Sequence, residues 1–108
     1  MGEDAAADVY CRRGFRVLAR NWRCSLGELD LVLERDRLLV FCEVKTRTGA
    51  AFGGGYEAVN WAKRRKLRSL AEAFLAAIDS RHRQVRFDVA SVWLGARGPD
   101  VEIFEDAF

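Results

Sequence analysis

Two apolar runs separated by a short polar break constrain this chain more than any other feature. The first run is Gly-Glu-Leu-Asp-Leu-Val-Leu-Glu, from position 27 to 34, and the second is Leu-Leu-Val-Phe-Cys-Glu-Val-Lys, from 38 to 45. Runs of this length with β-branched and aromatic residues are typical of strands, and a short polar break between two of them is typical of a hairpin. The sequence therefore predicts an antiparallel hairpin over residues 27–45.

A two-residue turn at Asp36 and Arg37 would fix which side chains of this hairpin lie opposite each other. Asp30 would then lie directly opposite Glu43. Directly opposed side chains have Cβ atoms roughly 4.5–5.5 Å apart, so like charges there repel each other. Two carboxylates are compatible at that distance if a cation sits between them or if they share a proton. Lys45 lies two residues after Glu43 and points to the same face.

Two simpler interpretations of this acidic pair stay open. Acidic residues are common on a solvated strand face, and Lys45 would then merely neutralise Glu43. The register is also weakly specified, because Asp-Arg is not a strong hairpin turn pair. A slip of one residue would move Asp30 to the opposite face of its strand.

The composition limits the class of protein. With 108 residues, half of them apolar, the chain is expected to fold as a single domain over residues 1–108. The net charge of +2 gives no argument for nucleic acid by itself. No apolar run approaches the roughly 20 residues of a membrane span, and the first residues do not resemble a signal peptide. We therefore expect a cytoplasmic protein with no membrane partner.

The cysteine pattern supports the same compartment. Cys11, Cys24 and Cys42 are widely spaced, and no two of them have CxxC spacing. Cys11 and Cys42 stand where apolar residues are expected. Buried or half-buried thiols in a reducing cytosol are therefore expected in place of a zinc site.

The remaining periodicity predicts a mixed α/β fold. A helix is expected over 3–13, a strand over 15–22 with Phe15, Val17 and Ala19 on one face, a helix over 61–78, a strand over 85–94 and a short strand over 101–104. The α-β-β-β-α-β order predicts a mixed sheet flanked by helices, in which the strand after the long helix runs parallel to a hairpin strand. Asp88 is interpreted as a half-exposed acid on that strand.

The long helix begins with an unusual concentration of positive charge. It has no acid before Glu72, and a basic first turn opposes the helix dipole, which indicates an anionic partner. An ordinary solvated basic face is the alternative. Lys63 lies four residues before the apolar Leu67, so its side chain is expected at the edge of the packed face, directed toward the carboxylates. The basic residues of this segment are Lys63, Arg64, Arg65, Lys66 and Arg68.

Two further segments carry candidate site residues. Glu3 lies in the first turn of the first helix, where the dipole alone already favours an acid. The glycine-rich segment after Lys45 is expected to be a mobile loop in which Arg47 suits phosphate contact and Phe52 and Tyr56 suit base stacking. Packing of the two rings back onto the core is an equal alternative.

Taken together, these motifs resemble the PD-(D/E)XK nuclease superfamily: an acid on the first helix, Gly-Glu-Leu-Asp on a strand, Glu-Val-Lys on the next, then a basic helix. The closer resemblance is to the YraN-type family of small bacterial predicted endonucleases, whose function as a group is not established. Leu29 stands where the superfamily motif has proline, which removes no ligand. The resemblance spans nearly the whole chain and rests on Gly2-Glu3, Gly14–Leu18, Asn21–Arg23, Gly27–Leu31, Phe41–Arg47, Ala58–Asn60 and Arg86–Val89.

The resemblance implies a restriction-endonuclease-like core with a Mg²⁺ or Mn²⁺ site. Asp30, Glu43 and the backbone carbonyl of Val44 would be its ligands, since hard cations prefer oxygen. Lys45 would orient or help to deprotonate the attacking water and would offset charge on the phosphate. The outer ligands would be Glu3 and Glu28, and the phosphate backbone would be bound by Arg47, Lys63, Arg64 and Lys66.

The resulting hypothesis is a metal-dependent endonuclease that hydrolyses phosphodiester bonds in nucleic acid. DNA is favoured over RNA, and the glycine-rich loop favours branched or single-stranded substrates. The alternative is a nucleic-acid-binding module that keeps the fold but cleaves little or nothing. A third interpretation is an adaptor whose basic helix docks an acidic protein. Whether the chain forms a homodimer through an exposed sheet edge is left open.

Overall fold

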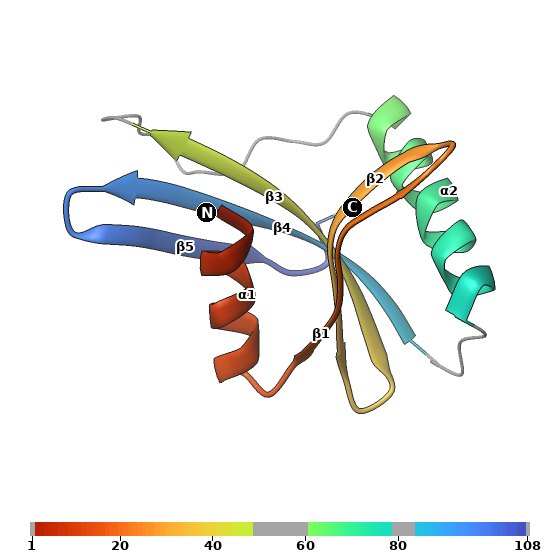
Figure 1. The fold of residues 1–108 in the computed structure, drawn as a ribbon, viewed down its shortest axis with the longest axis horizontal. Coiled ribbons are helices and arrows are strands. Elements are labelled where there is room, and N and C mark those ends of the chain that lie inside the picture. The colour runs from red at the N-terminus through yellow and green to blue at the C-terminus, as the bar shows by residue number, and fades with distance from the viewer. Residues whose placement is uncertain (1, 49–60, 79–83, 108) are drawn as a thin grey trace.

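Seven elements follow one another in the order that the sequence predicts. The computed structural model describes residues 2–48, 61–78 and 84–107. The predicted α/β class, a mixed sheet flanked by helices, is confirmed (Figure 1). The elements are α1 (Gly2–Arg12), β1 (Arg16–Cys24), β2 (Gly27–Arg35), β3 (Leu38–Thr48), α2 (Trp61–Ile78), β4 (Gln84–Gly95) and β5 (Gly98–Phe104).

The five strands form one sheet in which chain order is also spatial order, β1-β2-β3-β4-β5. Neighbouring strands are antiparallel except for β3 and β4, which run parallel on either side of the connection that contains α2. A parallel pair requires such a long crossover, whereas antiparallel strands need only short turns. The predicted parallel return strand is therefore confirmed.

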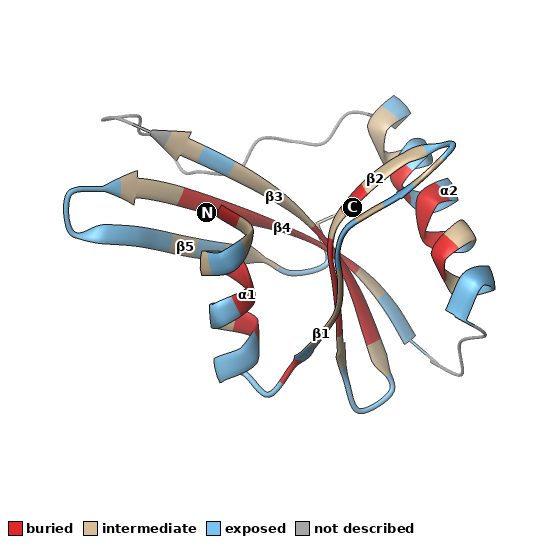
Figure 2. Cartoon of the chain, viewed as in Figure 1, coloured by how far each residue is buried: buried red, intermediate tan, exposed pale blue. Residues whose placement is uncertain are grey.

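The central strands present alternate side chains to two different helices. On β3, Leu39 and Phe41 belong to the core that packs against α2, whereas Val40 and Cys42 belong to the core that packs against α1. This alternation places the two helices on opposite faces of the sheet. Figure 2 shows that buried residues concentrate along the middle of the strands and on the inward sides of both helices. The helix residues in these cores are Ala6, Ala7 and Tyr10 of α1, and Leu67, Leu70, Ala71 and Phe74 of α2.

The first strand departs from its predicted simple alternation. The register of β1 against β2 shifts by one residue between Val17 and Ala19, which leaves Leu18 as the extra residue of a β-bulge. Val17 consequently packs on the α1 side and Ala19 on the α2 side, so the prediction that they share a face is wrong. Asn21 has a positive φ of 49° and adds a second irregularity to the same strand.

Asp88 is fully buried, so its interpretation as a half-exposed acid is wrong. Its carboxylate accepts hydrogen bonds from the Tyr10 hydroxyl at 2.6 Å, from Arg86 Nε at 2.8 Å and from the backbone N–H of Asp106 at 3.0 Å. Burial and the Asp88 carboxylate raise the pKa of Tyr10, which keeps its hydroxyl protonated as a donor. Through these hydrogen bonds, Asp88 connects α1 and the segment after β5 to the centre of the sheet.

The three thiols are free, but they are not equally buried. Cys42 is buried, and burial raises the pKa of its thiol. Cys24 is half-buried. Cys11 is exposed on α1, so the prediction of an apolar environment for it is wrong.

We expect Tyr10→Phe to lower the free energy of unfolding by about 1.5–3 kcal/mol, because it removes a buried hydrogen bond to a charged group. Asp4→Ala, which removes the exposed ion pair of α1 with Arg20, is the matched control and should cost less than about 1 kcal/mol. Urea denaturation measures both values. Equal losses for the two variants would contradict the structural role of Asp88.

Candidate functional site

The hairpin has the predicted register. Arg35 pairs with Leu38 across the turn, and the pairing continues to Leu31 and Cys42. Asp36 takes the first turn position with a positive φ of 55°, a conformation that aspartate tolerates better than most residues. The one-residue slip left open by the weak turn signal is therefore wrong.

Asp30 on β2 and Glu43 on β3 lie just beyond the last pair of the hairpin, at the point where the two strands separate. Pairing between the strands ends at Leu31 and Cys42, after which β2 continues along β1 and β3 continues along β4 (Figure 1). At this point the backbone N–H of Val44 donates a hydrogen bond of 2.8 Å to Asp30 Oδ2. Because the N–H and C=O of a strand residue point to the same side, the Val44 carbonyl also faces toward β2.

The negative charges of three other carboxylates act on Asp30. Burial raises the pKa of Asp30 from 3.8 to about 6. The hydrogen bond from Val44 lowers this pKa, whereas the negative charges of Glu43, Glu3 and Glu28 each raise it. The structure thus brings both predicted outer acids into electrostatic range of Asp30.

Glu3 reaches this group because the start of α1 approaches β3 closely. Gly2 is buried, and a Cβ at this position would clash with the hydroxyl of Thr46 and lie 3.5 Å from a methyl group of Val44. The absence of a side chain therefore permits the helix to begin directly over the strand that carries Glu43.

Glu28 lies two residues before Asp30 on β2, and its charge acts on Asp30. Its carboxylate also forms an ion pair with Arg23 of β1, with Nε and Oε2 2.5 Å apart. Arg23 and Glu28 are paired in the β1–β2 register. This partner of Glu28 was not predicted, although the short connection between β1 and β2 could have indicated it.

The partner of Glu43 comes from α2. The Nζ atom of Lys63 lies 2.9 Å from Glu43 Oε1, which confirms the prediction that this side chain is directed toward the carboxylates. Lys45 lies on the same face of β3 as Glu43, and its neighbour in register on β4 is the buried Ser91. Within the described part of the chain Lys45 forms no ion pair, so the cation that neutralises Glu43 is Lys63 and not Lys45.

The other predicted phosphate contacts lie on β3 and α2 and differ in exposure. Arg47 belongs to β3, which extends to Thr48, so its prediction as a loop residue is wrong. Its guanidinium lies 5.7 Å from the ring centroid of Trp93. Arg64 is half-buried on α2, and Lys66 is exposed beside Gly27 at the start of β2. The predicted stacking residues Phe52 and Tyr56 lie outside the described residues.

A protein-family model described as "Uncharacterised protein family UPF0102" matches residues 2–92, from the start of α1 into β4. The chain belongs to the UPF0102 family. This is the YraN-type family that the sequence resembles, and its description assigns no activity.

UPF0102 proteins from several bacteria are similar to this chain over most of their length. The protein from Mycolicibacterium gilvum is 48% identical over 108 residues, which cover 97% of this chain and 88% of the relative. The protein from Moorella thermoacetica is 43% identical over 110 residues, which cover 100% and 92%. The protein from Mycobacterium avium is 50% identical over 99 residues, which cover 90% and 77%.

Through its described residues, this UPF0102 chain could hold a hard divalent cation only with water or substrate completing the coordination. Among the described residues, no three Asp, Glu, His or Cys side chains converge closely enough to hold a metal ion. A Mg²⁺ site, however, commonly uses only one or two carboxylates and completes its coordination with water and substrate phosphate. Asp30, Glu43 and the Val44 carbonyl offer oxygen donors of that kind. Burial and the nearby negative charges disfavour the ionised form of Asp30, and a cation beside it would favour that form.

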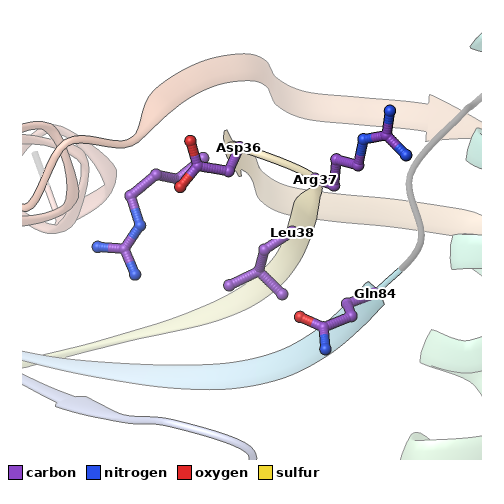
Figure 3. A pocket seen from close by; sticks show the side chains of 5 residues that line it. Asp36, Arg37, Leu38 and Gln84 are labelled. Carbon is purple, nitrogen blue, oxygen red and sulfur yellow. The ribbon is translucent and has the colours of Figure 1, made fainter.

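A pocket at the β2–β3 turn contains none of the predicted site residues. Its volume is about 510 Å³, and Figure 3 shows the side chains around it. The guanidinium of Arg35 donates a hydrogen bond of 2.8 Å to the Arg13 carbonyl and lies 4.4 Å from the centroid of the Phe15 ring, so it stabilises the fold. The pocket is lined by Arg35, Asp36, Arg37, Leu38 and Gln84.

In the described part of the chain, no helix is long and apolar enough to cross a membrane.

The raised pKa of Asp30 predicts a pH-dependent effect of Asp30→Asn. The native state holds the Asp30 proton more tightly than the unfolded chain, so the stability that this proton contributes is complete below pH 3.8 and is lost as the pH rises through about 6. The amide keeps an acceptor for Val44 and removes the charge. The melting temperature should therefore rise at pH 7.5 and change little at pH 3.5, whereas Asp4→Asn should show no such contrast. An equal gain at both pH values would exclude charge as the cause.

Proposed function

We propose that this chain is a metal-dependent phosphodiesterase that cleaves nucleic acid as an endonuclease of the PD-(D/E)XK type. The observation that carries the proposal is the position of Asp30 and Glu43 just beyond the last paired residues of β2 and β3, with Lys45 on the same strand face as Glu43. Half-buried carboxylates so close together are unfavourable without a function or a cation to offset them. Their position next to a basic helix favours a phosphate-containing substrate.

Asp30, Glu43 and the Val44 carbonyl would hold Mg²⁺ or Mn²⁺, which when bound lowers the pKa of water and polarises the scissile phosphate. The hydrogen bond from Val44 fixes the orientation of the Asp30 carboxylate before any ion arrives. Lys45 would hold the attacking water and donate to the phosphate oxygen on which charge develops. Glu3 and Glu28 would add negative potential and accept hydrogen bonds from water around the ion.

The substrate would be bound through its phosphates. The first turn of α2 contains no acid, and Arg64 and Lys66 follow Lys63 within one turn of the helix. Several basic residues close together give an affinity for nucleic acid that falls as the salt concentration rises and depends little on the base sequence. Arg47 would extend the same contact along β3.

DNA is favoured over RNA as the substrate. The free thiols support the proposal of a cytoplasmic protein, because disulfides are rare in the cytosol.

A nucleic-acid-binding module without cleavage is the second candidate. The ion pair of Lys63 with Glu43 favours it, because an internal ammonium group already neutralises one of the two carboxylates. The two candidates share the basic helix and differ only in whether the acidic residues take up a metal ion.

We expect wild-type protein to cleave at least one member of a panel of linear, flapped, branched and single-stranded DNA and RNA when Mg²⁺ or Mn²⁺ is present. Asp30→Ala and Lys45→Ala should each lower the rate by about 100-fold or more, since each removes a group that acts in the transition state. Circular dichroism would establish that the variants remain folded. Binding without cleavage across the whole panel would favour the binding module.

The double variant Arg64→Ala/Lys66→Ala should weaken binding about equally for unrelated sequences. The slope of log affinity against log salt concentration should fall by about one for each lost phosphate contact. Fluorescence anisotropy at several salt concentrations measures both effects. The control for loss of surface charge is Arg16→Ala. Arg16 begins β1, whereas Gly27, which Lys66 contacts, pairs with the last residue of β1. An unchanged slope in the double variant would remove α2 from the interface.

A further inference from the structure

The ion pair between α2 and β3 joins a largely buried side chain to a more exposed one. The side chain of Glu43 is only 14% exposed, whereas the side chain of Lys63 is 41% exposed. A buried carboxylate needs a positive partner, because an uncompensated charge at such a site is strongly destabilising. Lys63 supplies that charge from the end of a long, flexible side chain that also reaches solvent.

We propose that Lys63 is an internal counter-ion that occupies the Glu43 carboxylate until a divalent cation displaces it, and that the displaced ammonium group then binds substrate phosphate. This inference rests on the proposed function, because it assumes that Glu43 is a metal ligand. It adds that uptake of metal and uptake of nucleic acid favour each other through this one side chain.

The surroundings of the ion pair favour exchange over a permanent bridge. Asp30 lies beside Glu43, and the negative charges of Glu43, Glu3 and Glu28 disfavour ionisation of Asp30. Lys63 brings one positive charge to Glu43, whereas a divalent ion bound by Asp30 and Glu43 would bring two. Lys63 contacts Oε1 of Glu43, and an ion that binds the same oxygen would displace the ammonium group.

Packing of α2 keeps Lys63 within reach of both partners. Leu67 and Leu70 are buried against the sheet, which holds the first turns of the helix over the acidic residues. Lys66, one turn from Leu70, lies against Gly27, where a Cβ would come within 3.0 Å of its side chain. The helix therefore need not move for exchange, because rotation of the Lys63 side chain is sufficient.

The coupling follows from linkage. Without nucleic acid, displacement of Lys63 breaks its ion pair with Glu43, and this loss weakens metal binding. With nucleic acid bound, a phosphate group takes the place of Glu43 as a partner of the ammonium group. Any factor by which nucleic acid strengthens metal binding must equal the factor by which metal strengthens nucleic-acid binding.

Isothermal titration calorimetry of Mn²⁺ into wild type, Lys63→Met and Lys66→Met tests the exchange. Methionine keeps an unbranched side chain of similar length and removes the charge. Lys63→Met should bind Mn²⁺ about 5-fold or more tightly than wild type without nucleic acid, in line with typical coupling between sites. Lys66→Met loses the same charge from the same helix and should change Mn²⁺ affinity much less. Equal or weaker Mn²⁺ binding by Lys63→Met would overturn the proposal.

A second measurement uses a phosphorothioate oligonucleotide that resists cleavage. It should strengthen Mn²⁺ binding to wild type several-fold and strengthen binding to Lys63→Met clearly less. Mn²⁺ should also raise the melting temperature of Lys63→Met more than that of wild type, because the variant has lost the partner of Glu43. Lys63→Gln provides the same comparison if the methionine variant folds poorly.

The outcomes separate this inference from the function on which it rests. If wild type and Lys63→Met bind Mn²⁺ with equal affinity, the counter-ion exchange fails and the metal site stands. If neither binds Mn²⁺ with or without the oligonucleotide, the proposed metal-dependent function fails and the exchange fails with it.

Discussion

The hydrogen bond from the Val44 N–H to Asp30 is the interaction on which the geometry of this protein depends. Where two strands of a sheet separate, backbone groups lose their partners, and each buried unpaired group costs about 1–3 kcal/mol. The Asp30 carboxylate replaces the missing backbone acceptor, so β2 can leave β3 and continue along β1. The same bond holds this carboxylate next to Glu43. The break in strand pairing and the acidic cluster are therefore one structural feature.

Two aspartates, Asp30 on β2 and Asp88 on β4, show how differently the fold treats a carboxylate. Asp88 is more deeply buried than Asp30, yet it accepts hydrogen bonds from Tyr10, Arg86 and the Asp106 backbone, and a guanidinium balances its charge. Asp30 receives one backbone donor and faces three other acids. A carboxylate of the first kind stabilises the fold, whereas one of the second kind is maintained at a cost and indicates a site.

The sequence predicted the part of this arrangement that local rules determine. A two-residue turn and side-chain alternation placed Asp30, Glu43 and Lys45, and the four-residue spacing from Leu67 directed Lys63 toward them. It failed where tertiary contacts decide. Nothing local marks the bulge at Leu18, and the burial of Asp88 depends on a tyrosine 78 residues away. Arg47 was assigned to a loop because glycines follow it, whereas pairing with β4 keeps it in a strand.

The acidic residues and the basic helix are each unfavourable alone. Clustered carboxylates disfavour their own ionisation, and a helix with no acid in its first turn has positive charge at its positive end. Packing of α2 on the sheet brings the two together, so that Lys63 offsets Glu43 and the helix gains an anion near its N-terminus. Arg23 offsets the charge of Glu28, and Lys66 is exposed to solvent beside Gly27 at the start of β2. The half-buried carboxylates and the exposed basic residues of α2 are thus held side by side. A cation bound by the carboxylates and a phosphate bound by the basic residues would together balance both charges.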